Sequence, residues 1–221
     1  ARKFGLAASF MAKPYAERPG NGMHVHLSVL DEKGRNIFDD GSEQGSAAMR
    51  HALAGLLAAM PESMLIFAPH QNSYRRFAIE QHAPIAACWG YENRTTALRV
   101  PLGPSSQRRI EHRVAGADTN PYLVLAAILA GVLAGLESED TPPPPHIGSA
   151  YEADLPALPA SWKAAHDAFA EGDMLKQYLP GCFARCCLIA RLKKCADLRV
   201  ISLPLSINLI LIRHKYAIST L

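Results

Sequence analysis

The sequence has little net charge, few aromatic residues and no long uninterrupted hydrophobic run. A formal charge of +3 at pH 7 does not by itself indicate nucleic acid or a membrane surface as a partner. Aromatic residues make up 7% of the chain, so the mixing of basic and aromatic residues typical of base stacking is thin. The longest apolar run, residues 122–136, is short for a membrane span. We therefore expect neither a nucleic-acid partner nor a membrane span.

The sequence also lacks paired cysteines and a recognisable secretory signal. Its five cysteines are an odd number without ligand-like spacing, and four of them crowd into residues 182–195. Residues 1–10 carry charge but have neither the apolar core nor the cleavage site of a signal peptide. These features predict a reducing, cytoplasmic setting.

Several short stretches have the pattern of strands. Alternation over residues 23–30 predicts a strand, followed by a turn at 31–34 and then by either a hairpin or a loop return. The polar residues 72–81 are expected to form a loop. Three further short strands are expected at residues 85–91, 95–101 and 107–114.

Three stretches have the pattern of helices, and hydrophobic residues, at 49% of the chain, suffice for the core of one globular domain. Residues 43–60 are expected to form a helix that ends before Pro61. A second helix is expected to run to about residue 137, with Thr or Asn as its cap and Pro in its first turn. A third is expected to begin at Ser161, as its cap, and to reach residue 171.

Two histidines follow a pair of glycines in the stretch GNGMHVHLS, residues 20–28. Because residues two apart share one face of a strand, His24 and His26 should point the same way. Imidazole is both a metal ligand and a hydrogen-bond partner for phosphate. Gly20 and Gly22 would allow a ligand close to the backbone. On pattern alone, two half-buried histidines in an ordinary strand explain the stretch equally simply, and more commonly.

A second stretch, QRRIEHR, places charge on one face of a strand. Arg109, Glu111 and Arg113 alternate, so a carboxylate would lie between two guanidinium groups. Glutamate oxygens suit Mg²⁺ or Mn²⁺, and arginine binds carboxylate and phosphate in a fork. A solvated ladder of ion pairs is the alternative. Seven arginines within thirty-nine residues favour an anion pocket: Arg75, Arg76, Arg94, Arg99, Arg108, Arg109 and Arg113.

Five stretches together resemble one family. The chain is similar to the C-terminal part of the catalytic domain of glutamine synthetase and its relatives, the γ-glutamyl-amine ligases. The resemblance runs in the family's order over about residues 10–179. It is carried by FMAKPYAERPGNGMHVHLS, APHQNSYRRF, WGYENRTTALRVP, RRIEHRVAGADTNPYLVLAAILAG and the PPPP connector.

The resemblance implies an α+β fold, in which a curved, mainly antiparallel sheet carries the site on its concave face and helices pack on one side. Residues 1–180 would be a partial catalytic domain of this type. Residues 181–221, which are apolar and rich in cysteine, do not match the amphipathic helix and aromatic ending of the family. That departure is typical of a frameshifted or otherwise altered end.

The resemblance also implies roles for individual residues, and we expect His24, Arg94 and Glu111 to converge on the concave face. The implied site residues are His24 and Glu111 for a divalent metal, Gly20, Arg76 and Arg113 for glutamate, His26, Ser28, Arg99 and Arg109 for ATP, and Arg94 and His82 for catalysis.

The implied reaction has two steps and uses Mg²⁺ or Mn²⁺. ATP phosphorylates the γ-carboxylate of glutamate, and an amine or ammonia then attacks the acyl phosphate. Metal ions and arginines would neutralise the charge that develops. Full-length members of the family form homo-oligomeric rings.

Three differences from the family set expectations of their own. His82 stands where the family has a flap glutamate that helps deprotonate ammonium, although Glu80 could be a displaced substitute. An imidazole there favours a larger amine or a polyamine. Pro19 and Ser106 replace an asparagine on the substrate side and a lysine on the ATP side, which argues against glutamine synthesis itself.

The third difference is that the family's other metal-binding carboxylates lie upstream of this segment. Two hypotheses follow. The chain is the C-terminal part of an ATP-dependent γ-glutamyl ligase, or it is a catalytically inactive remnant that acts only as a binding or assembly module.

Overall fold

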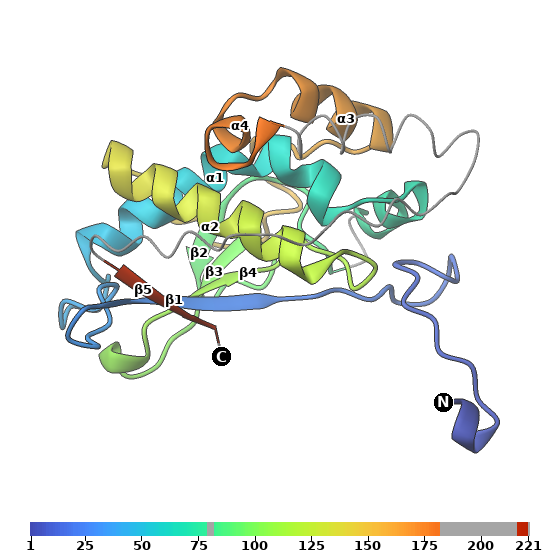
Figure 1. Cartoon of the computed structure of the whole chain (residues 1–221), viewed down its shortest axis with the longest axis horizontal. Helices are drawn as coiled ribbons and strands as arrows, with labels where there is room; N and C mark the ends of the chain where they lie inside the picture. Colours follow the sequence, from blue (N-terminus) through green and yellow to red (C-terminus); the bar gives the residue numbers. More distant parts are fainter. Residues whose placement is uncertain (79–81, 182–215, 221) are drawn as a thin grey trace.

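The computed structural model describes residues 1–78, 82–181 and 216–220. Figure 1 shows a sheet on one side of the molecule and a stack of helices on the other, with the N-terminal residues running away from both. The expectation for Glu80 lies outside the described residues, and so does most of the cysteine-rich tail expected at 181–221, namely residues 182–215 and 221.

The part of the chain that the structure describes forms a five-stranded sheet in the order β2-β3-β4-β1-β5. The central strand β1 (Val25–Asp31) pairs antiparallel with β4 (Ile110–His112) on one side and with β5 (Tyr216–Thr220) on the other. Strand β3 (Leu98–Val100) is antiparallel to β4, and β2 (Trp89–Tyr91) is parallel to β3. The α+β fold with a mainly antiparallel sheet is therefore confirmed.

Turns and short 3-10 helices connect these strands. After β1 the chain returns, and Ile37 N–H donates to the Val29 carbonyl at 2.8 Å, so the return is held by main-chain contact. The expected loop at 72–81 contains a 3-10 helix, η2 (Gln71–Arg76), and another, η3 (Ser105–Gln107), precedes β4.

In the described residues, four α-helices form the other layer: α1 (Ala47–Phe67), α2 (Pro121–Ser138), α3 (Trp162–Glu171) and α4 (Met174–Tyr178). Side-chain caps begin three of them. Ser46 accepts from Met49 N–H, Asn120 from Tyr122 N–H and Ser161 from Ala164 N–H. The expected second and third helices are confirmed.

The expected end of the first helix before Pro61 is wrong, because α1 continues through Pro61 to Phe67. A proline inside a helix costs about 3 kcal/mol. The turns after it bury four large apolar side chains, each worth about 1.5–3 kcal/mol. These are Met64, Leu65, Ile66 and Phe67, all at most 3% exposed. Burial therefore outweighs the lost hydrogen bond.

Among the described helices, α2 alone is long and apolar enough to cross a membrane by length and composition. Core helices of soluble proteins pass the same test, and α2 packs against α1 and α4. The close approach of α1 and α2 depends on glycine. A Cβ at Gly135 would lie 2.0 Å from the carbonyl oxygen of His51 and 2.9 Å from the amide nitrogen of Gly55.

The open edge of β2 is covered by the segment that contains four consecutive prolines, 142–145. The indole N–H of Trp89 donates to the Pro143 carbonyl at 2.7 Å, and His146 N–H donates to the Trp89 carbonyl at 2.8 Å. Further along, an antiparallel bridge joins Ala86 to Ala157. We call residues 142–158 the strap.

We expect Gly135→Ala to lower the free energy of unfolding by at least about 2 kcal/mol, because its methyl group would meet backbone atoms. Gly131→Ala is the matched control in the same helix. Its Cβ would lie 3.3 Å from Ala59 and Leu56 atoms, and alanine favours the helix by about 1 kcal/mol, so the net change should be small. Urea denaturation measures both. Equal losses would contradict the glycine contact between α1 and α2.

Candidate functional site

The two histidines and Glu111 meet where β1 pairs with β4. His26 lies opposite Glu111 in the antiparallel register, and His24 is two residues before it. His24 Nδ1 is 2.9 Å from Glu111 Oε1, and His26 Nε2 is 4.0 Å from the same oxygen. The two imidazoles therefore share one face of the sheet, as the alternation predicted.

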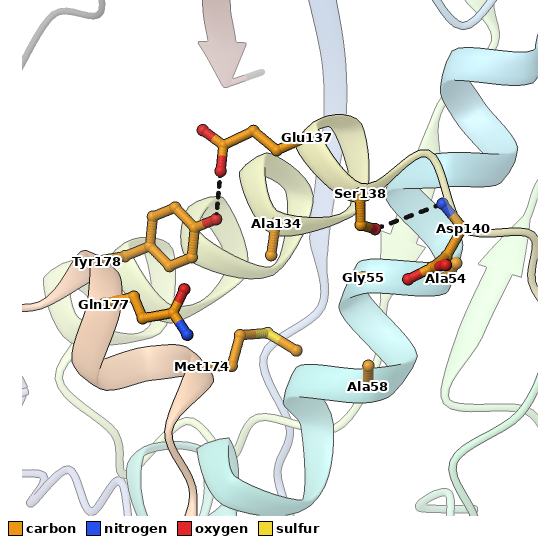
Figure 2. A pocket seen from close by; sticks show the side chains of 10 residues that line it. All are labelled: Ala54, Gly55, Ala58, Ala134, Glu137, Ser138, Asp140, Met174, Gln177 and Tyr178. Carbon is orange, nitrogen blue, oxygen red and sulfur yellow. Dashed lines mark hydrogen bonds between the residues drawn. The ribbon is translucent and has the colours of Figure 1, made fainter.

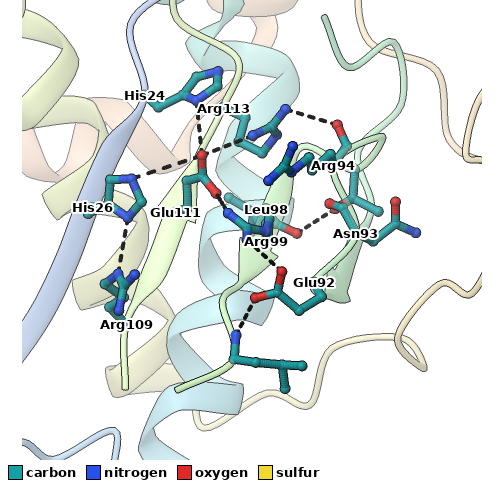
Figure 3. Close-up of polar contacts among 12 residues, drawn as sticks. His24, His26, Glu92, Asn93, Arg94, Leu98, Arg99, Arg109, Glu111 and Arg113 are labelled. Atoms are coloured by element: carbon teal, nitrogen blue, oxygen red, sulfur yellow. Dashed lines mark hydrogen bonds and ion pairs between the residues drawn. The ribbon is translucent and has the colours of Figure 1, made fainter. Parts of the chain in front are cut away.

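The side chains of Arg99 and Arg113 also bind the Glu111 carboxylate. Arg99 Nη1 donates to Oε2 at 2.6 Å, and Arg113 Nη1 donates to Oε1 at 2.9 Å (Figure 3). The Glu111 side chain is only 4% exposed. The alternative of a solvated ladder of ion pairs is therefore wrong for Glu111, since this buried carboxylate lies between two guanidinium groups.

This setting keeps Glu111 ionised. Burial by itself would raise its pKa, but hydrogen bonds from His24 and Arg99 and the charges of Arg113 and Arg99 lower it far below its usual range. The pKa of His26 is lowered, mainly by burial and also by the charge of Arg109, with Glu111 acting in the opposite direction. His26 is therefore biased toward its neutral form.

The remaining implied ATP residues lie along the same two strands. Arg109 Nε donates to His26 Nδ1 at 3.3 Å. The hydroxyl of Ser28 donates to the backbone carbonyl of Arg108 at 3.0 Å. Arg109 thus joins the histidine side of the cluster, whereas the Ser28 hydroxyl is engaged by the backbone.

Arg94 lies in the loop that follows β2, and its backbone contacts the cluster. Its backbone carbonyl accepts a 2.9 Å hydrogen bond from Arg113 Nη2. Figure 3 shows its side chain drawn on the same side as those of Arg113 and Glu111. The expected convergence of His24, Arg94 and Glu111 on one side of the sheet is therefore seen.

Sequence reasoning missed Glu92, which binds the other end of Arg99. Its Oε2 accepts from Arg99 Nη2 at 2.6 Å, so Arg99 lies between two carboxylates. Strands β2 and β3 are parallel, and Gly90 pairs with Arg99, which brings Glu92 close to Arg99. A signal existed, because Glu92 directly follows β2 in the stretch that resembles the family.

Arg76 occupies a separate buried position behind the glycines. It is 5% exposed, and its Nη1 donates to the Val114 carbonyl at 3.3 Å. A Cβ at Gly20 would lie 3.0 Å from Arg76 Cγ, and one at Gly22 would lie 3.0 Å from Arg76 Nη2. Both glycines therefore make room for Arg76, a reason that the sequence did not reveal.

His82 is not tied to this cluster. It is exposed, has a left-handed backbone with φ 56°, and makes no hydrogen bond or ion pair with any described residue. The structure therefore does not bring His82 together with Glu111.

A divalent metal would find only part of a coordination shell here. His24 and Glu111 are of suitable ligand types and lie close together. Within the part of the chain that the structure describes, no group of three or more His, Cys, Asp or Glu residues could hold a metal ion. The donor types fit, but two of them are too few to bind a metal tightly.

A cavity of about 380 Å³ lies elsewhere, between α1, α2 and α4. Among the residues that line it, the Tyr178 hydroxyl donates to Glu137 at 2.6 Å (Figure 2). Burial, with the Glu137 contact, raises the pKa of Tyr178 to about 12. None of the implied site residues lines this cavity.

Comparisons with known proteins place this geometry in context. The sequence model of the glutamine synthetase catalytic domain matches residues 1–198. The γ-glutamylputrescine synthetase of Escherichia coli K12 is 44% identical over 81% of this chain. The γ-glutamylethanolamide synthetase of Streptomyces coelicolor is 43% identical over 78% of it. The chain spans 38% and 37% of these relatives, respectively.

A solved structure gives the same result for the fold. The structure of GmaS without ligand superposes with a TM-score of 0.77 at 29% identity, covering 90% of this chain and 48% of that one. The match of the family model extends past residue 180, and the boundary expected there stays a prediction.

We expect stability to fall in acid partly through Glu111. Because folding lowers its pKa, its contribution is complete above the ordinary value of 4.5 and is lost as the pH falls toward the lowered value. Glu111→Gln should cost about 3 kcal/mol at neutral pH. It should also flatten the pH dependence between about pH 5 and pH 3.

Urea denaturation at each pH measures this effect. Glu171→Gln removes one carboxylate from the exposed end of α3 and serves as the control, with little expected change. The same pH dependence in wild type and Glu111→Gln would contradict the prediction.

Proposed function

Because the chain belongs to the glutamine synthetase family of ligases, we propose that it is part of an ATP-dependent γ-glutamyl ligase that joins glutamate to an amine through γ-glutamyl phosphate. The observation that carries this proposal is the buried Glu111 carboxylate, held 2.6–2.9 Å from Arg99, Arg113 and His24. Such a preorganised cluster suits the neutralisation of transferring phosphate and carboxylate groups.

The arginines divide the work of binding anions. In this proposal Arg99 and Arg109, with His26 and Ser28, face the phosphates of ATP. Arg94 faces the transferring phosphoryl group, and Arg76 and Arg113, with Gly20, bind glutamate. Support comes from the placement of Arg99, Arg109 and Arg113 around β1 and β4 and from the extensive burial of Arg76 and Arg113.

In the same proposal His24 and Glu111 would hold Mg²⁺ or Mn²⁺, which supplies charge neutralisation at the phosphates when bound. Glu111 is oriented for such a role by Arg99 and Arg113, which fix both of its oxygens. The other ligands would have to come from phosphate, water or further protein. The proposed setting is cytoplasmic and the complete protein a homo-oligomer.

A second candidate function has its own support. In the part of the chain that the structure describes, no group of three or more His, Cys, Asp or Glu residues could hold a metal ion. This favours a chain that binds anions without turnover, as a binding or assembly module. This candidate concerns the chain as given, whereas ligase activity belongs to a longer protein.

We expect this chain alone to bind ATP, phosphate or citrate weakly and in a strongly salt-sensitive way, without ligase turnover. Positive charge from Arg76, Arg94, Arg99, Arg109 and Arg113 exceeds the nearby carboxylate charge. Mg²⁺ and Mn²⁺ held by two protein donors should bind poorly. Calorimetry with Mn²⁺ and with ATP, at low and moderate salt, measures this. Tight Mn²⁺ binding without nucleotide, or glutamate-dependent phosphate release, would show the prediction to be wrong.

We expect a longer protein that contains this chain and supplies the missing carboxylates to prefer larger amines over ammonia. The physical reason is His82, whose imidazole holds a small ammonium ion less well than a carboxylate does. Phosphate release with glutamate, ATP and either putrescine, ethanolamine or ammonia measures the preference. His82→Glu should shift it toward ammonia by about tenfold, or about 1.4 kcal/mol. Strong turnover with ammonia and none with the larger amines would contradict the proposal.

A further inference from the structure

Glu92 has an unusual backbone for its residue type. Its φ is +50°, which puts it in the left-handed region, where side chains other than glycine, asparagine and aspartate are rare. Such conformations cost of order 1 kcal/mol and persist where surrounding contacts impose them. Glu92 directly follows β2, at the edge of the arginine cluster. The contacts of the Glu92 side chain therefore indicate why this backbone conformation is kept.

Both carboxylate oxygens of Glu92 are engaged. Oε2 accepts from Arg99 Nη2 at 2.6 Å, and Oε1 accepts from the backbone N–H of Leu102. Its own N–H donates to the Val100 carbonyl at 3.1 Å. The left-handed turn thus aims one carboxylate both at an arginine of the site and at the start of the loop that leads to η3.

The two carboxylates on Arg99 differ in exposure. Glu111 is 4% exposed, so separating it from Arg99 would leave a buried negative charge with one partner fewer, which is costly. Glu92 is 36% exposed and would regain water if it were displaced. The Arg99 side chain is 15% exposed, so the pair is partly exposed on its Glu92 side, and such a pair is worth about a few-fold in equilibrium. An incoming anion would therefore displace Glu92 and leave Glu111 in place.

We propose that Glu92 is an internal competitor for phosphate: it occupies Arg99 when the site is empty and yields Arg99 to the polyphosphate of a nucleotide. This inference rests on the proposed function, because it takes Arg99 to face phosphate. Figure 3 shows Glu92 on the opposite side of Arg99 from Glu111.

The same carboxylate links phosphate binding to a loop. Leu102 is 66% exposed, and its backbone N–H is held by Glu92. The chain then passes through Gly103 and η3 before reaching Arg109. When Glu92 leaves Arg99 it also leaves Leu102, so binding of polyphosphate releases residues 102–107. Occupancy of the phosphate site and the freedom of this loop are therefore coupled.

The first test compares the binding of tripolyphosphate to wild type and to Glu92→Gln. Glutamine keeps the size of the side chain but loses the charge, so it competes poorly with phosphate. We expect the dissociation constant to fall by about 2- to 5-fold. Glu171→Gln makes the same change in net charge on α3 and should leave the constant unchanged. Calorimetry at one fixed salt concentration measures all three proteins.

The second test follows hydrogen exchange at the Leu102 amide. In wild type, tripolyphosphate should speed its exchange, whereas in Glu92→Ala, which has no side-chain oxygen to accept from Leu102, exchange should be fast from the start and insensitive to the anion. A local ion pair without competition would leave exchange unchanged on binding.

The outcomes separate this inference from the proposed function. Equal dissociation constants for wild type and Glu92→Gln, or slower exchange at Leu102 on binding, would overturn the role of Glu92 and leave the proposed function standing. No binding of tripolyphosphate by either protein would overturn both.

Discussion

The structure depends on keeping one negative charge, that of Glu111, out of water. A lone buried carboxylate would be very costly, and here it is compensated by Arg99, Arg113 and His24 at distances of 2.6–2.9 Å. Each partner comes from a different place along the chain. The charge of Glu111 is therefore compensated only if β1, β3 and β4 keep their register. The chemistry of the site thus depends directly on the topology of the sheet.

The opposite face of β4 shows why the register holds. His112, next to Glu111, is fully buried, and its ring centroid lies 4.6 Å from that of Phe67 at the end of α1. Burial lowers the pKa of His112 to about 3, so it packs as a neutral ring. A slip by one residue would put an ionised carboxylate into the core and an imidazole among the arginines. The helices thus fix the site from behind.

Local rules predicted what depends on local periodicity. The two-residue repeat placed His24 and His26 on one face, and cap residues such as Ser161 marked helix starts. The error at Pro61 came from burial against distant elements, which no local signal encodes. Glu92 was missed because its role depends on a left-handed turn and on parallel pairing of β2 with β3. The sequence likewise did not show that Gly20 and Gly22 make room for Arg76, because over fifty residues separate them from it.

The strap along β2 has a consequence for how the protein behaves in concentrated solution. An uncovered edge offers main-chain groups to any extended segment nearby and so invites stacking of one molecule on another. Here Pro143 and His146 already satisfy groups of Trp89. Because proline has no N–H, residues 142–145 offer no donors of their own for a further strand. The strap therefore leaves fewer main-chain groups at this edge for pairing with a second molecule.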